Sequence, residues 1–249
     1  MPELRVYHRY GEELERMLNL GTSPMAVKML ENESDIPQGA VRPARDRGCH
    51  LAQCQAFALS RRQKETVAML KEDNWCFAPL IAYGLVDRPD DPRFSKFTSF
   101  PAFERGKYIG IVSAPLKTAG FRPDVVIIYS NTAQLRDMLI PVHFMDMEHI
   151  IDYHFFPPAC SYLLVPVMKS GTYMIALPDP GEHMRALPGE DEIILSIPEP
   201  RLDDFMSGLT RMEEGKFGYG RPSYMMQTDF SQPPMYKELF TKWGLSRKK

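Results

Sequence analysis

The chain has 249 residues, of which 44% are hydrophobic and 25% are charged, and its formal net charge is −2. This length and composition are typical of a globular protein with room for one large domain. The near-neutral charge argues against nucleic acid or an anionic membrane surface as a partner, because both attract a basic protein.

The first half of the chain predicts interleaved helices and strands. An amphipathic pattern predicts a helix over residues 3–20, and a short apolar run predicts a strand over residues 25–30. Residues 31–48 are rich in proline, glycine and charge, which is typical of a surface loop. The elements expected next are a helix over 49–62, a strand over 66–70, a helix over 76–85, a loop over 89–101, and strands over 108–115 and 124–129.

The second half continues the same alternation. It predicts helices over 132–140, 159–168 (with Pro166 inside) and 200–212, and strands over 150–156, 173–177 and 192–197. We therefore expect an α/β fold of the mixed α+β kind, a single domain over residues 1–212 with a mixed β-sheet flanked by helices. Residues 213–249 predict a C-terminal extension that wraps the domain or contacts a partner, with a short amphipathic segment over 236–243.

Four cysteines carry the main chemical signal: Cys49, Cys54, Cys76 and Cys160. No secretory signal and no apolar run of bilayer length is evident, so we expect a cytoplasmic protein. Cysteines of reducing compartments bind metals or catalyse reactions more often than they form disulfides. Cys76 and Cys160 are each expected at the start of a helix, where the helix dipole lowers the pKa of a thiol.

The spacing of the cysteines leaves the number of ligands open. Five positions on a continuous helix separate Cys49 from Cys54 by about 140°, so Cys49 must precede the helix if both bind one group. Three or four thiolates suit an iron–sulfur cluster. The lack of a C-x-x-C pair weakens structural zinc. Four small buried thiols in a cofactor-free ligand-binding or scaffold protein are the other alternative.

Histidines add weaker candidates. His143, His149 and His154 lie close in sequence without metal-ligand spacing, and we interpret them as surface or structurally satisfied residues. His50 is next to Cys49, where it would either tune a cluster or face solvent.

Charged residues near the cysteines have two interpretations. Asp179 and Arg185 are expected to form a structural ion pair, with binding of a substrate carboxylate by the Arg fork as the alternative. A group of basic residues predicts a solvated face, or else an anion-binding rim or a docking surface for an acidic electron-transfer partner: Arg42, Arg45, Arg47, Arg61 and Arg62.

Several short segments occur in a fixed order along the chain. The first is Leu20-Gly21-Thr22-Ser23-Pro24-Met25-Ala26-Val27-Lys28. The later segments are Cys54-Gln55-Ala56, Cys76 with Gly84, Ala114-Pro115-Leu116, Phe121-Arg122-Pro123-Asp124, Cys160, Pro178-Asp179-Pro180-Gly181 with Arg185, and Ile197-Pro198. Together they resemble domain-of-unknown-function family 169, a prokaryotic family, and the resemblance covers roughly residues 10–212.

The resemblance implies an intracellular protein from anaerobe-rich lineages with a cysteine-held cofactor, and it implies no reaction. It marks Cys54, Cys76 and Cys160 as family cysteines and Cys49 as an addition. We therefore expect an iron–sulfur protein, with a [4Fe–4S] cluster held by three or four cysteines. Its expected role is redox or Lewis-acid chemistry on a small molecule. The expected partner is a small-molecule substrate or an electron-transfer protein, while enzymatic activity and self-association stay open.

Overall fold

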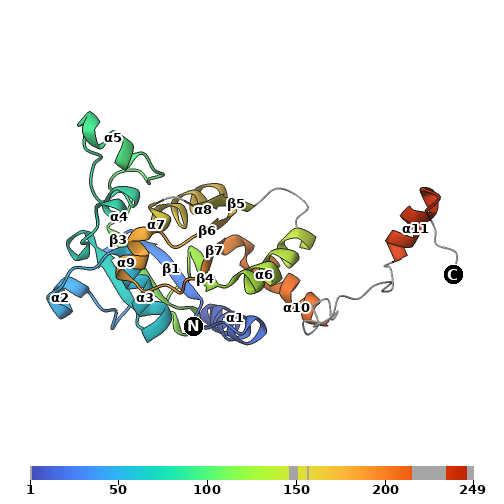
Figure 1. Cartoon of the computed structure of the whole chain (residues 1–249). Helices are drawn as coiled ribbons and strands as arrows, with labels where there is room; N and C mark the ends of the chain where they lie inside the picture. The colour runs from blue at the N-terminus through green and yellow to red at the C-terminus, as the bar shows by residue number, and fades with distance from the viewer. Residues whose placement is uncertain (1, 146–150, 156, 215–233, 246–249) are drawn as a thin grey trace.

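The computed structural model describes residues 2–145, 151–155, 157–214 and 234–245. Its centre is a seven-stranded mixed sheet with the strand order β2-β3-β1-β4-β7-β6-β5 (Figure 1). Neighbouring strands are antiparallel except β5 and β6, which are parallel. The strands are β1 (Met25–Leu30), β2 (Val67–Leu70), β3 (Gly110–Pro115), β4 (Val125–Ser130), β5 (Ile151–His154), β6 (Tyr173–Ala176) and β7 (Ile193–Pro198). The predicted mixed sheet flanked by helices is confirmed.

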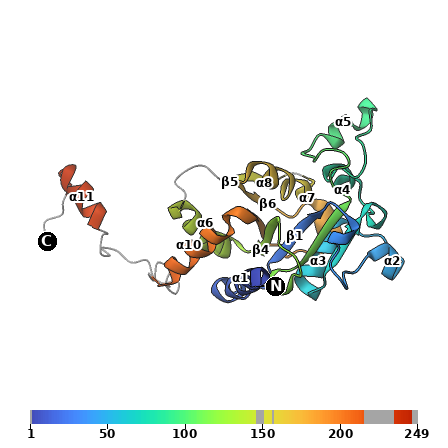
Figure 2. The same ribbon diagram turned by 180° about the vertical axis from the view of Figure 1, so that it is seen from behind.

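Helices cover both faces of the sheet, as two views from opposite sides show (Figures 1 and 2). In β1, the side chains of Ala26 and Leu30 join one core, whereas those of Met25 and Val27 join the other, as strand alternation requires. The first core is covered by α1 (Pro2–Leu18), α6 (Thr132–Met145) and α10 (Leu202–Glu214). The second is covered by α3 (Gln53–Gln63), α4 (Phe77–Ala82), α7 (Ala159–Tyr162) and α8 (Val165–Ser170).

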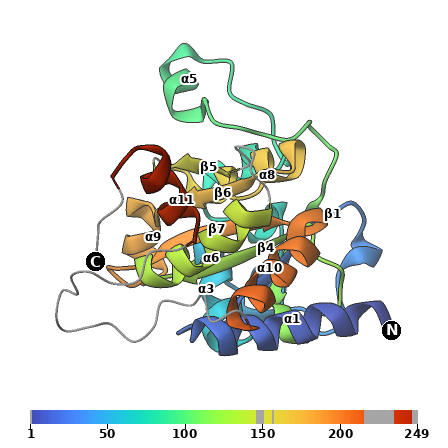
Figure 3. The ribbon, with the colours of Figure 1, turned by 90° about the vertical axis from the view of Figure 1, so that its right-hand side faces the viewer.

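Three short elements differ from the expected pattern. The predicted loops over 31–48 and 89–101 contain helices, namely α2 (Pro43–Arg47) and α5 (Pro92–Thr98). Each begins with a proline, whose fixed φ suits the first helical turn. The helix expected over 159–168 is instead two helices, because Pro166 lies in the first turn of α8. Figure 3 shows α5 standing away from the sheet, on the side opposite α1.

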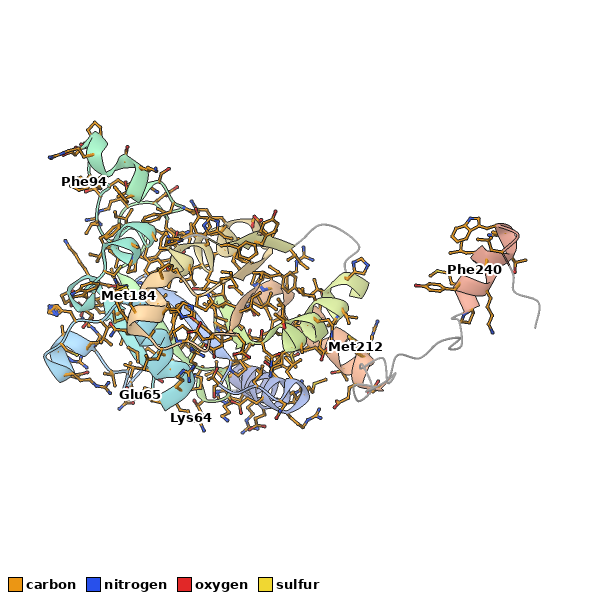
Figure 4. All side chains as sticks on the ribbon, in the orientation of Figure 1. Lys64, Glu65, Phe94, Met184, Met212 and Phe240 are labelled. Atoms are coloured by element: carbon orange, nitrogen blue, oxygen red, sulfur yellow. The ribbon has the colours of Figure 1, made fainter. Side chains whose placement is uncertain are left out.

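The expected C-terminal extension is described only in part. Helix α10 continues to Glu214, and α11 (Pro234–Lys242) confirms the predicted amphipathic segment. No residue of α11 is buried, and the side chain of Phe240 is labelled on it in Figure 4. Residues 215–233 lie outside the described residues, so the role of the extension stays a prediction. Throughout the described ranges, no helix combines the length and apolar character that crossing a membrane requires.

A buried carboxylate organises the end of β2. Asp73 is 0% exposed and closes the short turn η2 (Lys71–Asp73). Its carboxylate accepts hydrogen bonds from Arg42 Nε at 2.7 Å, from the Ala44 amide at 2.9 Å and from the Leu70 amide at 2.8 Å. Arg42 is itself buried, so this ion pair ties α2 to the end of the strand.

The same turn joins the segments that lead into α3 and α4. The amide of Leu51 donates to the carbonyl of Asp73 at 3.0 Å, and the amide of Trp75 donates to the carbonyl of Leu51 at 2.9 Å. These two bonds place the chain before Cys54 beside the chain before Cys76.

We predict that Asp73→Asn lowers the free energy of unfolding by about 3–5 kcal/mol, because it leaves buried Arg42 without its buried counter-charge. Urea denaturation measures this loss. Glu72→Gln is the matched control, since Glu72 contacts the same guanidinium but is 62% exposed. It should cost under about 1 kcal/mol. Equal losses in the two variants would contradict the structural role given to Asp73.

Candidate functional site

Three of the four cysteines line one cavity of about 610 Å³: Cys54, Cys76 and Cys160. The cavity lies on the sheet face that α3, α4 and α7 cover, and its walls include Phe57, Phe77 and Phe100. Residues far apart in the sequence thus bring their thiols to one cavity. A ligand that fills this cavity lies against all three cysteines.

Each of these cysteines lies at the beginning of a helix. Cys54 is the second residue of α3, Cys76 is the residue that precedes α4, and Cys160 is the second residue of α7. The predicted helix starts at Cys76 and Cys160 are confirmed. Helix α4 packs against α7, which holds the last two segments together.

Cys49 lies elsewhere. It follows Gly48 at the end of α2, and its Sγ is 3.9 Å from the carbonyl oxygen of Pro43. Cys49 precedes α3, which is the position it would need in order to bind the same group as Cys54. It does not line the cavity, however. The structure thus brings together three of the four candidate cysteines and leaves the fourth outside.

A second carboxylate fixes the segment that carries Cys160. Asp179 caps α9 (Pro180–Arg185), because its Oδ1 accepts the amide of Glu182 at 2.9 Å. Its Oδ2 accepts the amide of Ala159, the residue before Cys160, at 3.0 Å. Asp179 therefore connects α9 to α7 and lines the cavity itself.

The expected ion pair between Asp179 and Arg185 is wrong, because the two side chains have separate partners. Arg185 Nη1 donates to the carbonyl of Gly181 at 3.1 Å, and the guanidinium carbon lies 4.7 Å from the centre of the Trp75 ring. The neighbouring α9 residue Met184 is labelled in Figure 4. Arg185 lines the same cavity as the thiols.

Burial raises the pKa of two cavity thiols, those of Cys54 and Cys160. It raises the pKa of Cys54 to about 12, with further contributions from Glu182 and Asp179, while Arg185 acts in the opposite direction. Burial also raises the pKa of Cys160 well above its usual range, and the nearby Cys76 adds to this increase. The lowering of the thiol pKa that was expected at this helix start is wrong for Cys160, because burial raises that pKa instead.

Glu182 adds a buried acid to the cavity wall. Burial raises the pKa of its carboxyl to about 7, although the Tyr129 hydroxyl donates to it at 2.6 Å. The guanidinium of Arg61 lies 3.8 Å from the centre of the Tyr129 ring and pairs with Glu192 through two bonds of 2.6 and 2.8 Å. The predicted solvated basic face is therefore wrong for Arg61 and Arg42, which are both buried in ion pairs.

Gln53 is the least satisfied polar residue of the site. It is 2% exposed, lines the cavity, and neither its amide nitrogen nor its amide oxygen has a hydrogen-bond partner within the described part of the chain. Sequence reasoning missed both Gln53 and Glu182. The only sequence signal for Gln53 was its position directly before Cys54. Glu182 follows Asp179 with the Asp-x-x-Glu spacing of an ordinary helix cap, so nothing in the sequence was a reason to place it in a site.

The candidate histidines are divided among different environments. His154 lines the cavity and its ring stacks on Tyr162, whereas His50 is exposed outside the cavity and His143 is exposed on α6. His149 lies outside the described residues. Among the residues with described positions, no three His, Cys, Asp or Glu side chains are already grouped around a single metal ion.

Comparison with known families agrees with the resemblance seen in the sequence. A family model for DUF169, described as "Uncharacterised ArCR", matches residues 13–208, which include every residue of the cavity wall. Comparisons with curated proteins and with solved structures gave no match. Because the model matches most of the chain, this protein belongs to domain-of-unknown-function family 169.

Proposed function

We propose that this protein binds an iron–sulfur cluster, of the [4Fe–4S] type, through Cys54, Cys76 and Cys160 in the cytoplasm. The observation that carries the proposal is that these thiols, from three separate helices, line one cavity. Thiolates are the usual ligands of such clusters, and distant cysteines can supply them. A reducing cytoplasm keeps the thiols free of disulfides.

The charge balance of the cavity supports a metal-bound state. Three thiols and two carboxyl groups, those of Asp179 and Glu182, line the cavity. Thiolates there are costly without a cation, which is why burial raises the pKa of Cys54 and of Cys160. Iron ions would replace the thiol protons and offset that cost.

A cluster bound by three cysteines, and not by four, is better suited to Lewis-acid chemistry on a small molecule than to simple electron transfer. With Cys49 outside the cavity, a cluster of four irons would keep one iron without a protein thiolate, and that iron would be a Lewis acid toward a small molecule. The chain's own contribution would be to hold the cluster and to limit the access of water with Phe57 and Phe100. The cavity volume leaves space for a small substrate beside a cluster.

We predict that Cys54→Ser, Cys76→Ser and Cys160→Ser each abolish cluster binding, whereas Cys49→Ser retains it. Each protein would be purified anaerobically and reconstituted with Fe²⁺ and sulfide, and then assayed for iron, sulfide and visible absorbance. Cys49→Ser is the matched control because its thiol lies outside the cavity.

Circular dichroism of each variant separates loss of the cluster from loss of the fold. Full iron content in folded Cys160→Ser would contradict the ligand assignment. One zinc ion per chain without iron would indicate a structural zinc domain, and neither metal under strict anaerobiosis would support the cofactor-free alternative.

We also predict an unusual pH dependence of thiol reactivity in the metal-free protein. A raised pKa means that Cys54 and Cys160 are neutral at pH 7, so the reactive thiolate fraction grows about tenfold per pH unit. Alkylation by iodoacetamide, mapped by mass spectrometry, should still accelerate above about pH 9 at both positions. A short peptide containing Cys54 should reach its plateau near the ordinary thiol pKa of about 8.5. A plateau at the same pH in the folded protein would refute the burial argument.

A further inference from the structure

The unsatisfied amide of Gln53 indicates a second ligand in the cavity. A buried amide without partners loses its bonds to water and gains nothing in return, so native proteins rarely retain one. Gln53 is the first residue of α3, directly before Cys54, and lines the cavity with 2% exposure. Its side chain offers both an acceptor and donors, which together match a hydroxyl group.

Arg185 supplies a positive charge that would complement an anionic group of such a ligand. It lines the same cavity, and among the described residues no carboxylate lies within ion-pair distance of its guanidinium. A Cβ at Gly181 would lie 2.6 Å from Arg185 Nη1, so the glycine makes room for the guanidinium in this position. Its planar fork is suited to a carboxylate.

The two residues come from elements that pack together. Helix α3, which begins with Gln53, contacts α9, which ends with Arg185. The charge of Arg185 also acts on the thiol of Cys54, the residue after Gln53. Apolar groups complete the wall, with Phe57 and Leu163 each 1% exposed and Phe100 7% exposed.

We propose that this cavity binds a small hydroxycarboxylate with an apolar substituent. The carboxylate pairs with Arg185, the hydroxyl exchanges hydrogen bonds with Gln53, and the substituent packs against Phe57 and Phe100. This inference rests on the proposed function, because the ligand occupies the space beside the cluster. It adopts for Arg185 the substrate-carboxylate role that the sequence left as the alternative.

Mandelate is the probe, because it combines a carboxylate, a hydroxyl and a phenyl group. Isothermal titration of the anaerobically reconstituted protein should detect mandelate binding. Phenylacetate lacks the hydroxyl and mandelamide lacks the charge, and each should bind about 10–100-fold more weakly. Lactate, which lacks the phenyl group, should also bind more weakly than mandelate.

Two variants assign these differences to residues. Gln53→Leu should reduce mandelate affinity to that of phenylacetate and leave phenylacetate affinity nearly unchanged. Arg185→Gln should reduce mandelate affinity to that of mandelamide. Arg62→Gln is the control, since Arg62 is 40% exposed, pairs with Glu192 and lies outside the cavity. It should bind all four compounds as the parent protein does.

Iron content, measured on every sample, separates the two proposals. Parent protein with a full complement of iron that binds neither mandelate nor lactate would overturn the ligand inference and leave the cluster proposal intact. The ligand inference would also be overturned if Gln53→Leu and Arg185→Gln both retained iron and still discriminated among the four compounds as the parent protein does. Parent protein that assembles no cluster would overturn both proposals.

Discussion

The candidate site depends on a short backbone pairing between the two segments that lead into Cys54 and Cys76. The carbonyl of Leu51 accepts a hydrogen bond from the amide of Trp75, and the amide of Leu51 donates a hydrogen bond to the carbonyl of Asp73. Because Cys54 follows Leu51 by three residues and Cys76 follows Trp75 directly, this pairing brings two cysteines at the starts of two helices to the same cavity. The buried carboxylate of Asp73 is stable there only because three donors surround it. The geometry of the thiols therefore rests on an ion pair that takes no part in chemistry.

A similar arrangement brings in the third thiol and gives the cavity its electrostatic character. Asp179 connects α9 to the segment before Cys160, and Glu182 follows on the same helix. Burial disfavours the negatively charged form of three groups in this cavity wall, namely Cys54, Cys160 and Glu182. The carboxyl of Glu182, whose pKa is raised to about 7, and the neutral Cys54 thiol are two consequences of that constraint. A bound cation relieves it, and this links the architecture of the site to the proposed cofactor.

Much of the fold could be predicted from the sequence, because apolar periodicity and proline reflect local rules. The strand over residues 25–30 and the helix starts at Cys76 and Cys160 follow from such patterns. Contacts between distant segments could not be predicted in this way. The lack of a hydrogen-bond partner for buried Gln53 within the described residues is a property of the packed cavity wall. Arg61 is buried where Glu192 and the Tyr129 ring, both distant in the sequence, meet it. The expected pair of Asp179 with Arg185 failed because Asp179 caps its helix instead.

The most direct measurement is a crystal structure of the anaerobically reconstituted protein, with anomalous diffraction recorded on both sides of the iron absorption edge. The account predicts iron density inside the cavity, bonded to the sulfurs of Cys54, Cys76 and Cys160, with Cys49 unbound. Iron density held by Cys49, or a cavity without iron whose three thiols face apolar side chains, would contradict it.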